Sequence, residues 1–168
     1  FTEGFVYAEA NNIEDVKRLA KENKCIAVMV EIIQGEGGVC PLTEEFVKAV
    51  REFTEENDML MIVDEVQTGN GRSGMLYSYM NYDVMPDIVS TAKGIGGGLP
   101  LGATMLGEKV KDIFTPGSHG STFGGNPVST AGAISIIERI DDKLLAEVRE
   151  KSNYIFGELE HADGVEEV

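Results

Sequence analysis

Three chemically active side chains lie at or near the ends of apolar runs that have the length of buried strands. Asp64 comes directly after the five apolar residues 59–63, Lys93 follows another such run, and Glu31 interrupts the apolar segment 26–33. In an open α/β sheet, ligands bind beyond the carboxyl ends of the strands. The shared placement therefore predicts one composite site that contains both an acid and an amine.

The surroundings of Lys93 and Asp64 suggest what this chemistry is. Lys93 precedes a glycine cluster at 94–98, and glycines let the backbone approach a bulky ligand closely. A lysine that is partly desolvated there has a lowered pKa and acts as an amine nucleophile. Asp64 needs a cationic partner, because an isolated charge next to apolar residues is unfavourable. That partner is a protonated ring nitrogen of a cofactor in the functional interpretation, and a basic side chain or a helix end in the structural one.

A second candidate region is the glycine- and hydroxyl-rich segment 117–127. Ser121 and Thr122 lie there, just before the helix start signalled by Asn126 and its proline neighbour. Hydroxyls and free backbone N–H groups in front of a helix suit a phosphate group, although an ordinary glycine-rich loop has the same composition. His119 has no partner at metal-ligand spacing, so we expect no metal site.

Two motifs suggest nucleotide binding but lack their usual context. Residues 69–74 match the pattern G-x-G-x-x-G, yet four residues separate this stretch from Asp64, and no acidic strand end follows about 20 positions on. Residues 60–65 resemble the apolar strand of P-loop ATPases, but the chain contains no G-x-x-x-x-G-K-[ST]. A nucleotide-binding α/β module stays as an alternative, and a nucleotide hydrolase is strongly disfavoured.

The elements that must position these residues alternate along the chain. Strands are predicted at 26–33, 59–63, 87–91 and 101–106. Helices are predicted after Asn12, after Thr43 and from Asn126, and a fourth helix spans about 142–161 with its apolar side chains turned inward, namely Leu145, Val148, Ile155 and Leu159. This alternation predicts an α/β fold in three layers, with a mostly parallel sheet and helices on both faces.

Composition limits the class of protein further. The 168 residues suit one domain of ordinary size. The 14 basic and 29 acidic residues give a net charge of −15 and a pI of about 4.4, which argues against binding to nucleic acid or to anionic membranes. The chain has no apolar run of about 18 residues that would span a membrane. Two cysteines make no disulfide framework, so we expect a reducing, cytoplasmic location.

Four ordered motifs together resemble a known family. The chain reads E-I-I-Q-G-E-G-G at 31–38, D-E-V-Q-T-G at 64–69, the lysine segment at 90–100, and H-G-S-T-F-G-G-N-P at 119–127. This series is similar to the class III, ornithine-type aminotransferases of fold type I, and it covers nearly the whole chain. The resemblance implies a pyridoxal 5′-phosphate (PLP) cofactor. It also implies an amino-group transfer from N2-acetylornithine to 2-oxoglutarate in arginine biosynthesis. Members using ornithine, succinylornithine or 4-aminobutyrate are the alternatives.

The resemblance assigns roles in the cofactor site. Lys93 would form the Schiff base with PLP and then move the proton between the substrate and the cofactor. Asp64 would keep the pyridine nitrogen protonated, so that the ring accepts electrons. Val66 would pack on one face of the ring, and Gln67 would form a hydrogen bond with its phenolic oxygen.

Further roles concern the substrate and a second subunit. Ser121 would lie near the substrate, and Glu36 corresponds to the glutamate that manages the substrate side-chain pocket. Glu31 is a weaker candidate for a supporting contact. Thr122 would bind the phosphate of the neighbouring subunit's cofactor, which implies a homodimer that acts on small amino acids and 2-oxo acids.

The chain also departs from the family pattern. Ile32 replaces the proline that usually follows the first glutamate of its motif, which alters loop stiffness without removing a reacting group. Family members are much longer than 168 residues. We therefore expect a central piece that cannot transaminate alone, in which residues 1–140 form part of the PLP-binding large domain and residues 141–168 form a helix leading toward a small C-terminal domain.

Overall fold

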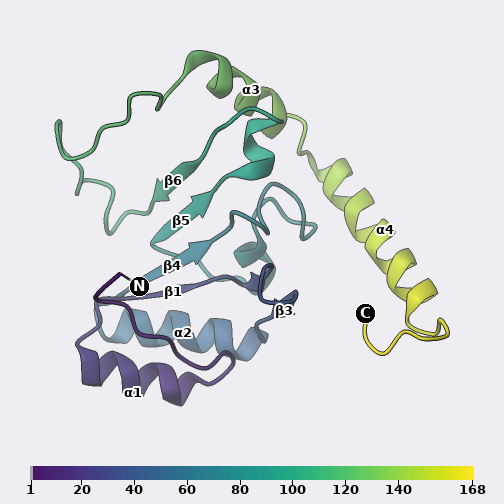
Figure 1. Ribbon diagram of the computed structural model, residues 1–168, viewed down its shortest axis with the longest axis horizontal. Coiled ribbons are helices and arrows are strands. Elements are labelled where there is room, and N and C mark those ends of the chain that lie inside the picture. The colour runs from purple at the N-terminus through teal and green to yellow at the C-terminus, as the bar shows by residue number, and fades with distance from the viewer. Residues whose placement is uncertain (1) are drawn as a thin grey trace.

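The computed structural model describes residues 2–168 and is built on a four-stranded sheet. The strands lie in the order β1-β4-β5-β6 (Figure 1). β1, β4 and β5 are parallel, and β6 pairs antiparallel with β5. The predicted α/β class with a mostly parallel sheet is confirmed. The bounds are β1 (Ala27–Val30), β4 (Leu60–Asp64), β5 (Ile88–Thr91) and β6 (Ala103–Leu106).

The predicted continuous strand at 26–33 is wrong in its second half. The chain leaves the main sheet after β1, and Ile32 is fully buried in the core. The next residues form β2 (Ile33–Gln34), which pairs antiparallel with β3 (Cys40–Pro41). The glycine-rich turn between β2 and β3 reverses the chain, and this turn becomes one wall of the candidate site.

Two helices cover one face of the sheet (Figure 1). α1 (Ile13–Asn23) packs against α2 (Glu44–Glu56), and α2 packs against β1 and β4. Both helices begin at the predicted caps. The Asn12 Oδ1 atom accepts the Asp15 N–H at 3.1 Å, and the Thr43 Oγ1 atom accepts the Phe46 N–H at 3.2 Å.

The hydrophobic core lies between α2 and the sheet. Val47, Val50, Met61 and Val63 are fully buried there, and full burial of such a side chain contributes about 1.5–3 kcal/mol. The segment around the short helix η1 (Ser78–Tyr82) closes the core with two stacked tyrosine rings, whose centroids lie 5.9 Å apart. The core thus fixes β4 on its helix-facing side and leaves the ends of the strands free.

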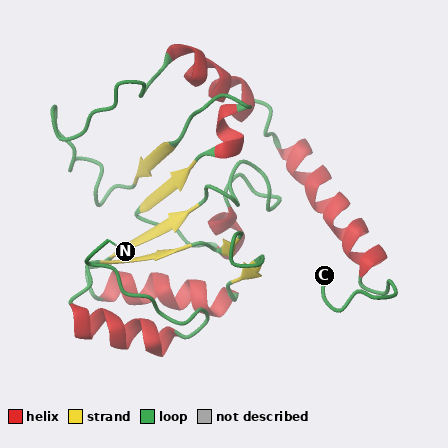
Figure 2. Cartoon of the chain, viewed as in Figure 1, coloured by secondary structure: helices red, strands yellow, loops and turns green. Residues whose placement is uncertain are grey.

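The C-terminal half is more open. After β5 come η2 (Lys93–Gly96), β6, α3 (Pro127–Ile137) and α4 (Asp142–Leu159). α3 packs against η2, and its cap Asn126 accepts the Val128 and Ser129 N–H groups as predicted. Figure 2 shows a long loop without helix or strand between β6 and α3.

The prediction that the apolar residues of α4 point inward is wrong for the described chain. No residue of α4 is buried. Ile155 is 53% exposed and Leu159 is 42% exposed, while Leu145 and Val148 are only half-buried. The reason is that α4 extends away from the sheet (Figure 1), so the distal part of its apolar side meets no described element.

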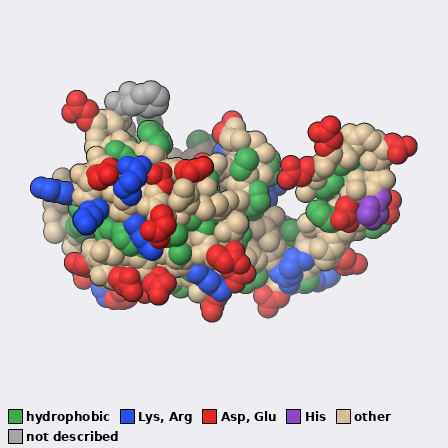
Figure 3. All heavy atoms as spheres, turned by 90° about the horizontal axis from the view of Figure 1, so that it is seen from below, with side chains coloured by type: hydrophobic (Ala, Val, Ile, Leu, Met, Phe, Trp, Pro, Cys, Tyr) green, Lys and Arg blue, Asp and Glu red, His purple; other side chains and the backbone are tan. Residues whose placement is uncertain are grey.

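The surface over α1 and α2 carries acidic and basic side chains in alternation (Figure 3). Several are paired along the helices at i,i+4 spacing, such as Arg18 with Glu22 at 2.8 Å. Among residues 2–168, no helix has the length and apolar character that crossing a membrane requires.

Candidate active site

The candidate site lies where β4 and β5 end. Asp64 is the last residue of β4 and stands beside Ser90 of β5, and Lys93 follows three residues later along the chain. A pocket of about 190 Å³ opens at this edge. Its lining is Glu31, Glu36, Asp64, Val66, Gln67 and Lys93. The structure therefore brings together all three strand-end regions that the sequence singled out.

The amine of this pocket is held by a neighbouring amide. The Lys93 Nζ atom donates a hydrogen bond to the Gln67 Oε1 atom. Gln67 is backed by the turn after β2, because a Cβ atom added at Gly35 would lie 2.7 Å from the Gln67 Cγ atom. Lys93 is exposed rather than partly desolvated as expected.

The acid of the pocket keeps a free side. Asp64 is half-buried, and its Oδ1 atom accepts the Val66 N–H at 2.8 Å. Within residues 2–168 no basic side chain forms an ion pair with Asp64. The structural interpretation of Asp64 as one half of an ion pair therefore does not hold for the described chain, and its carboxylate is available to a cationic group in the pocket.

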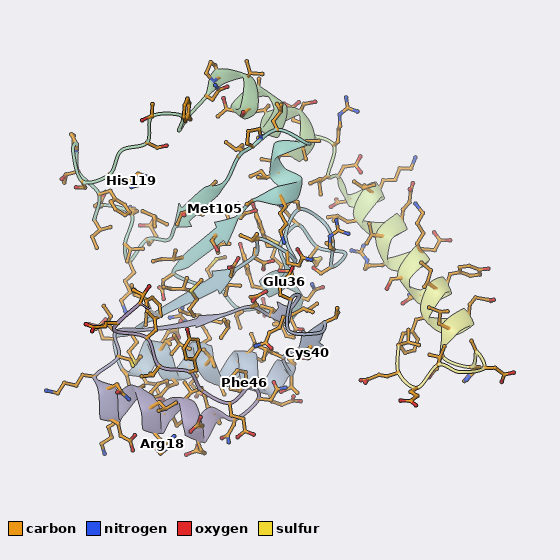
Figure 4. The ribbon with its side chains drawn as sticks, viewed as in Figure 1. Arg18, Glu36, Cys40, Phe46, Met105 and His119 are labelled. Atoms are coloured by element: carbon orange, nitrogen blue, oxygen red, sulfur yellow. The ribbon has the colours of Figure 1, made fainter. Side chains whose placement is uncertain are left out.

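The loop after β1 adds further negative charge. The Glu31 Oε2 atom accepts the Gly35 N–H at 3.4 Å, and Glu36 is exposed on the same turn. Figure 4 shows Glu36 beyond the ends of the strands. With Asp64, the pocket has three carboxylates against one lysine, an excess that favours positively charged groups of a ligand.

Glu65, which was not among the residues predicted from the sequence, supports the site from the core side. Its side chain is 0% exposed. Its carboxylate accepts hydrogen bonds from the Ser78 hydroxyl at 2.6 Å, the Thr68 hydroxyl at 2.5 Å and the Tyr79 N–H at 3.0 Å. Burial, and secondarily the Glu65 charge, raises the pKa of the Tyr79 phenol. Strand alternation was the available signal, because Glu65 continues the buried face of β4.

Ser121 and Thr122 do not line this pocket. Both side chains are exposed on the loop between β6 and α3. Figure 4 shows His119 on the same loop, far from Glu36. The ring of His119 stands 6.4 Å from that of Phe114. Among residues 2–168, no group of three or more His, Cys, Asp or Glu side chains is arranged to hold a metal ion.

The G-x-G-x-x-G match at 69–74 forms a turn. The chain continues from it into the short 3-10 helix η1, whereas a dinucleotide site needs the N-terminus of an α-helix at this place. Gly74 packs against Arg149 of α4, whose guanidinium donates to the Gly74 carbonyl. This turn therefore lacks the geometry of the nucleotide-binding alternative.

Comparison with known proteins agrees with the motifs. The family model described as Aminotransferase class-III matches residues 5–168. An acetylornithine aminotransferase of Aquifex aeolicus is 46% identical over 151 residues, which are 90% of this chain and 40% of that protein. A succinylornithine transaminase of Salmonella paratyphi A is 47% identical over 135 residues, which are 80% of this chain and 33% of that protein.

Solved structures give the same result. An N-acetylornithine aminotransferase from Stenotrophomonas maltophilia K279a superposes with a TM-score of 0.86 at 35% identity, over 98% of this chain and 44% of that one. An ornithine delta-aminotransferase of Plasmodium falciparum superposes with a TM-score of 0.87 at 29% identity, over 100% of this chain and 45% of that one. The chain thus spans less than half the length of these relatives, and it belongs to the class III aminotransferase family.

Proposed function

We propose that the whole protein is a PLP-dependent transaminase that moves the amino group of N2-acetylornithine to 2-oxoglutarate, as a step of arginine biosynthesis. One observation carries the proposal: Lys93 and Asp64, from the ends of adjacent parallel strands, line the same pocket. An amine and an acid that line one pocket suit a heterocycle that carries an aldehyde at one position and a basic nitrogen at another.

The residues of the pocket fit this cofactor. When bound, PLP supplies a ring that stabilises a carbanion at the substrate α-carbon. Asp64 would keep a proton on the ring nitrogen, and its free side supports this role. Val66 would pack on the ring face, and Gln67 would form a hydrogen bond with the phenolic oxygen. The Lys93 amine would bind the aldehyde carbon, and after release it would move the proton between the substrate α-carbon and C4′ of the cofactor.

The amino donor is proposed from the names of the relatives. The curated relatives cited above are named for acetylornithine and succinylornithine. We assign Glu36, on the exposed turn of the pocket, to the substrate side chain. Ornithine, succinylornithine and 4-aminobutyrate are the alternative donors. Steady-state rates of the full-length protein with each donor distinguish them, and the highest kcat/KM is expected for N2-acetylornithine.

The exposed loop before α3 supports a homodimer. Ser121 and Thr122 lie away from the pocket of their own chain. We propose that Thr122 binds the phosphate of the partner's cofactor and that Ser121 lies near the substrate. Residues 1–140 would then be part of the large domain, and 141–168 would lead toward a small domain. The isolated segment 1–168 is expected not to transaminate.

Borohydride trapping tests the central assignment. Full-length protein is loaded with PLP, reduced and digested, and the pyridoxyl adduct is located by peptide mapping. We expect the adduct on Lys93. Lys93→Ala should give no adduct at this position, and its turnover should fall at least about 10⁴-fold, because the reacting amine is gone. Lys48→Ala, on the exposed side of α2, is the control and should match the wild type. A sole adduct on another lysine would overturn the proposal.

A further inference from the structure

Asn70 contacts the backbone on both sides of Lys93. Its Nδ2 atom donates to the Thr91 Oγ1 atom at 3.2 Å and to the Ala92 carbonyl oxygen at 3.3 Å. It also packs against Gly94, where an added Cβ atom would lie 3.3 Å from the Asn70 Cβ atom. Asn70, in the turn at 69–74, therefore contacts the residues immediately before and after the lysine.

The backbone of Lys93 needs such support. Its φ angle is 48°, in the left-handed region that side-chain-bearing residues rarely adopt. A strained conformation of this kind persists only where the surrounding structure holds it. Thr91 is itself fixed, since it lies in β5 and is only 2% exposed. Asn70 thus links Lys93 to a rigid part of the core.

The φ angle of Asn70 is 60°, which asparagine tolerates better than most residues. Its side chain nevertheless carries a cost in stability. Its Oδ1 atom is buried with no hydrogen-bond partner in the described chain, and an unsatisfied buried acceptor is destabilising. The feature that offsets this cost is the pair of hydrogen bonds toward the residues that precede Lys93.

We infer that Asn70 is a positioning residue for the Lys93 amine. Its amide holds the left-handed turn at Lys93, so that Nζ points into the pocket beside Gln67. This inference rests on the proposed function, in which the amine must reach both the aldehyde carbon and the substrate α-carbon. Small errors in the position of a reacting group slow such steps strongly. Asn70 does not line the pocket, so it acts through the lysine.

Two substitutions in the full-length protein test the inference. Asn70→Gly accepts the positive φ angle and removes the amide, whereas Asn70→Asp keeps the shape and places an acceptor against the Ala92 carbonyl. The first readout is the rate at which Lys93 captures added PLP in the cofactor-free protein, followed by borohydride quenching and mass spectrometry. We expect both variants to capture the cofactor at least about tenfold more slowly. We also expect kcat to fall about tenfold while both KM values stay within about twofold, because the substrate contacts are intact.

Asn11→Gly is the matched control. Asn11 has the same φ angle of 60°, accepts the Thr43 N–H at 2.8 Å through its side chain, and does not line the pocket. It should leave capture and kcat unchanged. The inference would be overturned if both Asn70 variants captured PLP at the wild-type rate. It would also be overturned if the two variants captured PLP more slowly but an equal loss of melting temperature in both explained the slower rate. If wild-type protein gives no adduct on Lys93, the proposed function fails and the inference fails with it.

Discussion

At the scale of single residues, two adjacent acids have opposite surroundings. Successive side chains of a strand point to opposite faces. Asp64 therefore reaches the pocket, while Glu65 turns into the core and is 0% exposed. No basic side chain among residues 2–168 pairs with Glu65, and its carboxyl group accepts hydrogen bonds from two hydroxyls and one backbone N–H. Since Glu65 separates Asp64 from Val66, fixing Glu65 also fixes the backbone of the pocket.

Substituting Glu65 should test this anchoring. Glu65→Ala leaves the Ser78 hydroxyl and the Tyr79 N–H without their acceptor, so we expect the free energy of unfolding to fall by about 3 kcal/mol. Glu65→Gln retains one acceptor oxygen and should lower it by about 1 kcal/mol. Urea denaturation of the full-length protein measures both changes. Glu22→Gln, an exposed pair on α1, should stay within about 0.5 kcal/mol. An unchanged midpoint for Glu65→Ala would contradict the anchoring role.

At the scale of elements, a mostly buried ion pair aligns the strands that carry the site. Arg51 of α2 lies 3.0 Å from Asp87, and the two side chains are 11% and 12% exposed. The same Asp87 Oδ2 atom accepts the Met61 N–H of β4 at 2.8 Å. One carboxylate therefore connects α2, β4 and the start of β5. This contact sets the strand alignment that places Lys93 beside Asp64.

The attachment of α4 depends on the contact between Arg149 and Gly74. Gly74 has a φ angle of +80°, and an added Cβ atom would lie 2.6 Å from the Arg149 Cγ atom. Gly74→Ala should therefore lower stability by about 1–3 kcal/mol and loosen α4 from the turn. We expect faster hydrogen exchange in the first half of α4. Gly164→Ala is the control. It introduces the backbone strain alone, because its φ angle is +84° and no atom lies within 4 Å of the added Cβ atom. Equal exchange in both variants would show that the Arg149 contact is unimportant.

At the scale of the whole molecule, the excess of acidic groups shapes the stability. The net charge is −15, and such a charge destabilises a compact state through self-repulsion. The pocket shares this sign, because three of its six lining residues are carboxylates. A phosphate-bearing cofactor would therefore have to be held by local contacts against an unfavourable overall field.

This charge predicts a salt effect on folding. Raising NaCl from about 0.01 M to about 0.15 M shortens the screening length from roughly 30 Å to roughly 8 Å. We expect the melting temperature of the 168-residue chain, to which this charge belongs, to rise over this range and KCl to act equally, because the effect is screening rather than ion binding. A melting temperature that is flat or falls with salt would be inconsistent with repulsion between the acidic groups.

The sequence by itself determined the features that depend on neighbouring residues. Asn12, Thr43 and Asn126 cap the helices as predicted, since a cap bonds to N–H groups two or three positions away. The end of an apolar run fixed the position of Asp64 at a strand terminus. The ordered motifs also identified the family, which the match over residues 5–168 confirms.

Only the tertiary structure decided which distant groups meet. Asn70 reaches Ala92 across 22 positions and Glu65 reaches Ser78 across 13, and no local pattern encodes those pairs. The strand predicted over 26–33 ends early, at Val30, because the residues that follow form β2 and pair with β3 instead of continuing in the main sheet. The apolar side of α4 remained exposed because burial requires a facing element, which periodicity cannot supply. Local hydrogen bonding can be read along a chain, whereas burial and long-range contacts exist only once the chain has folded.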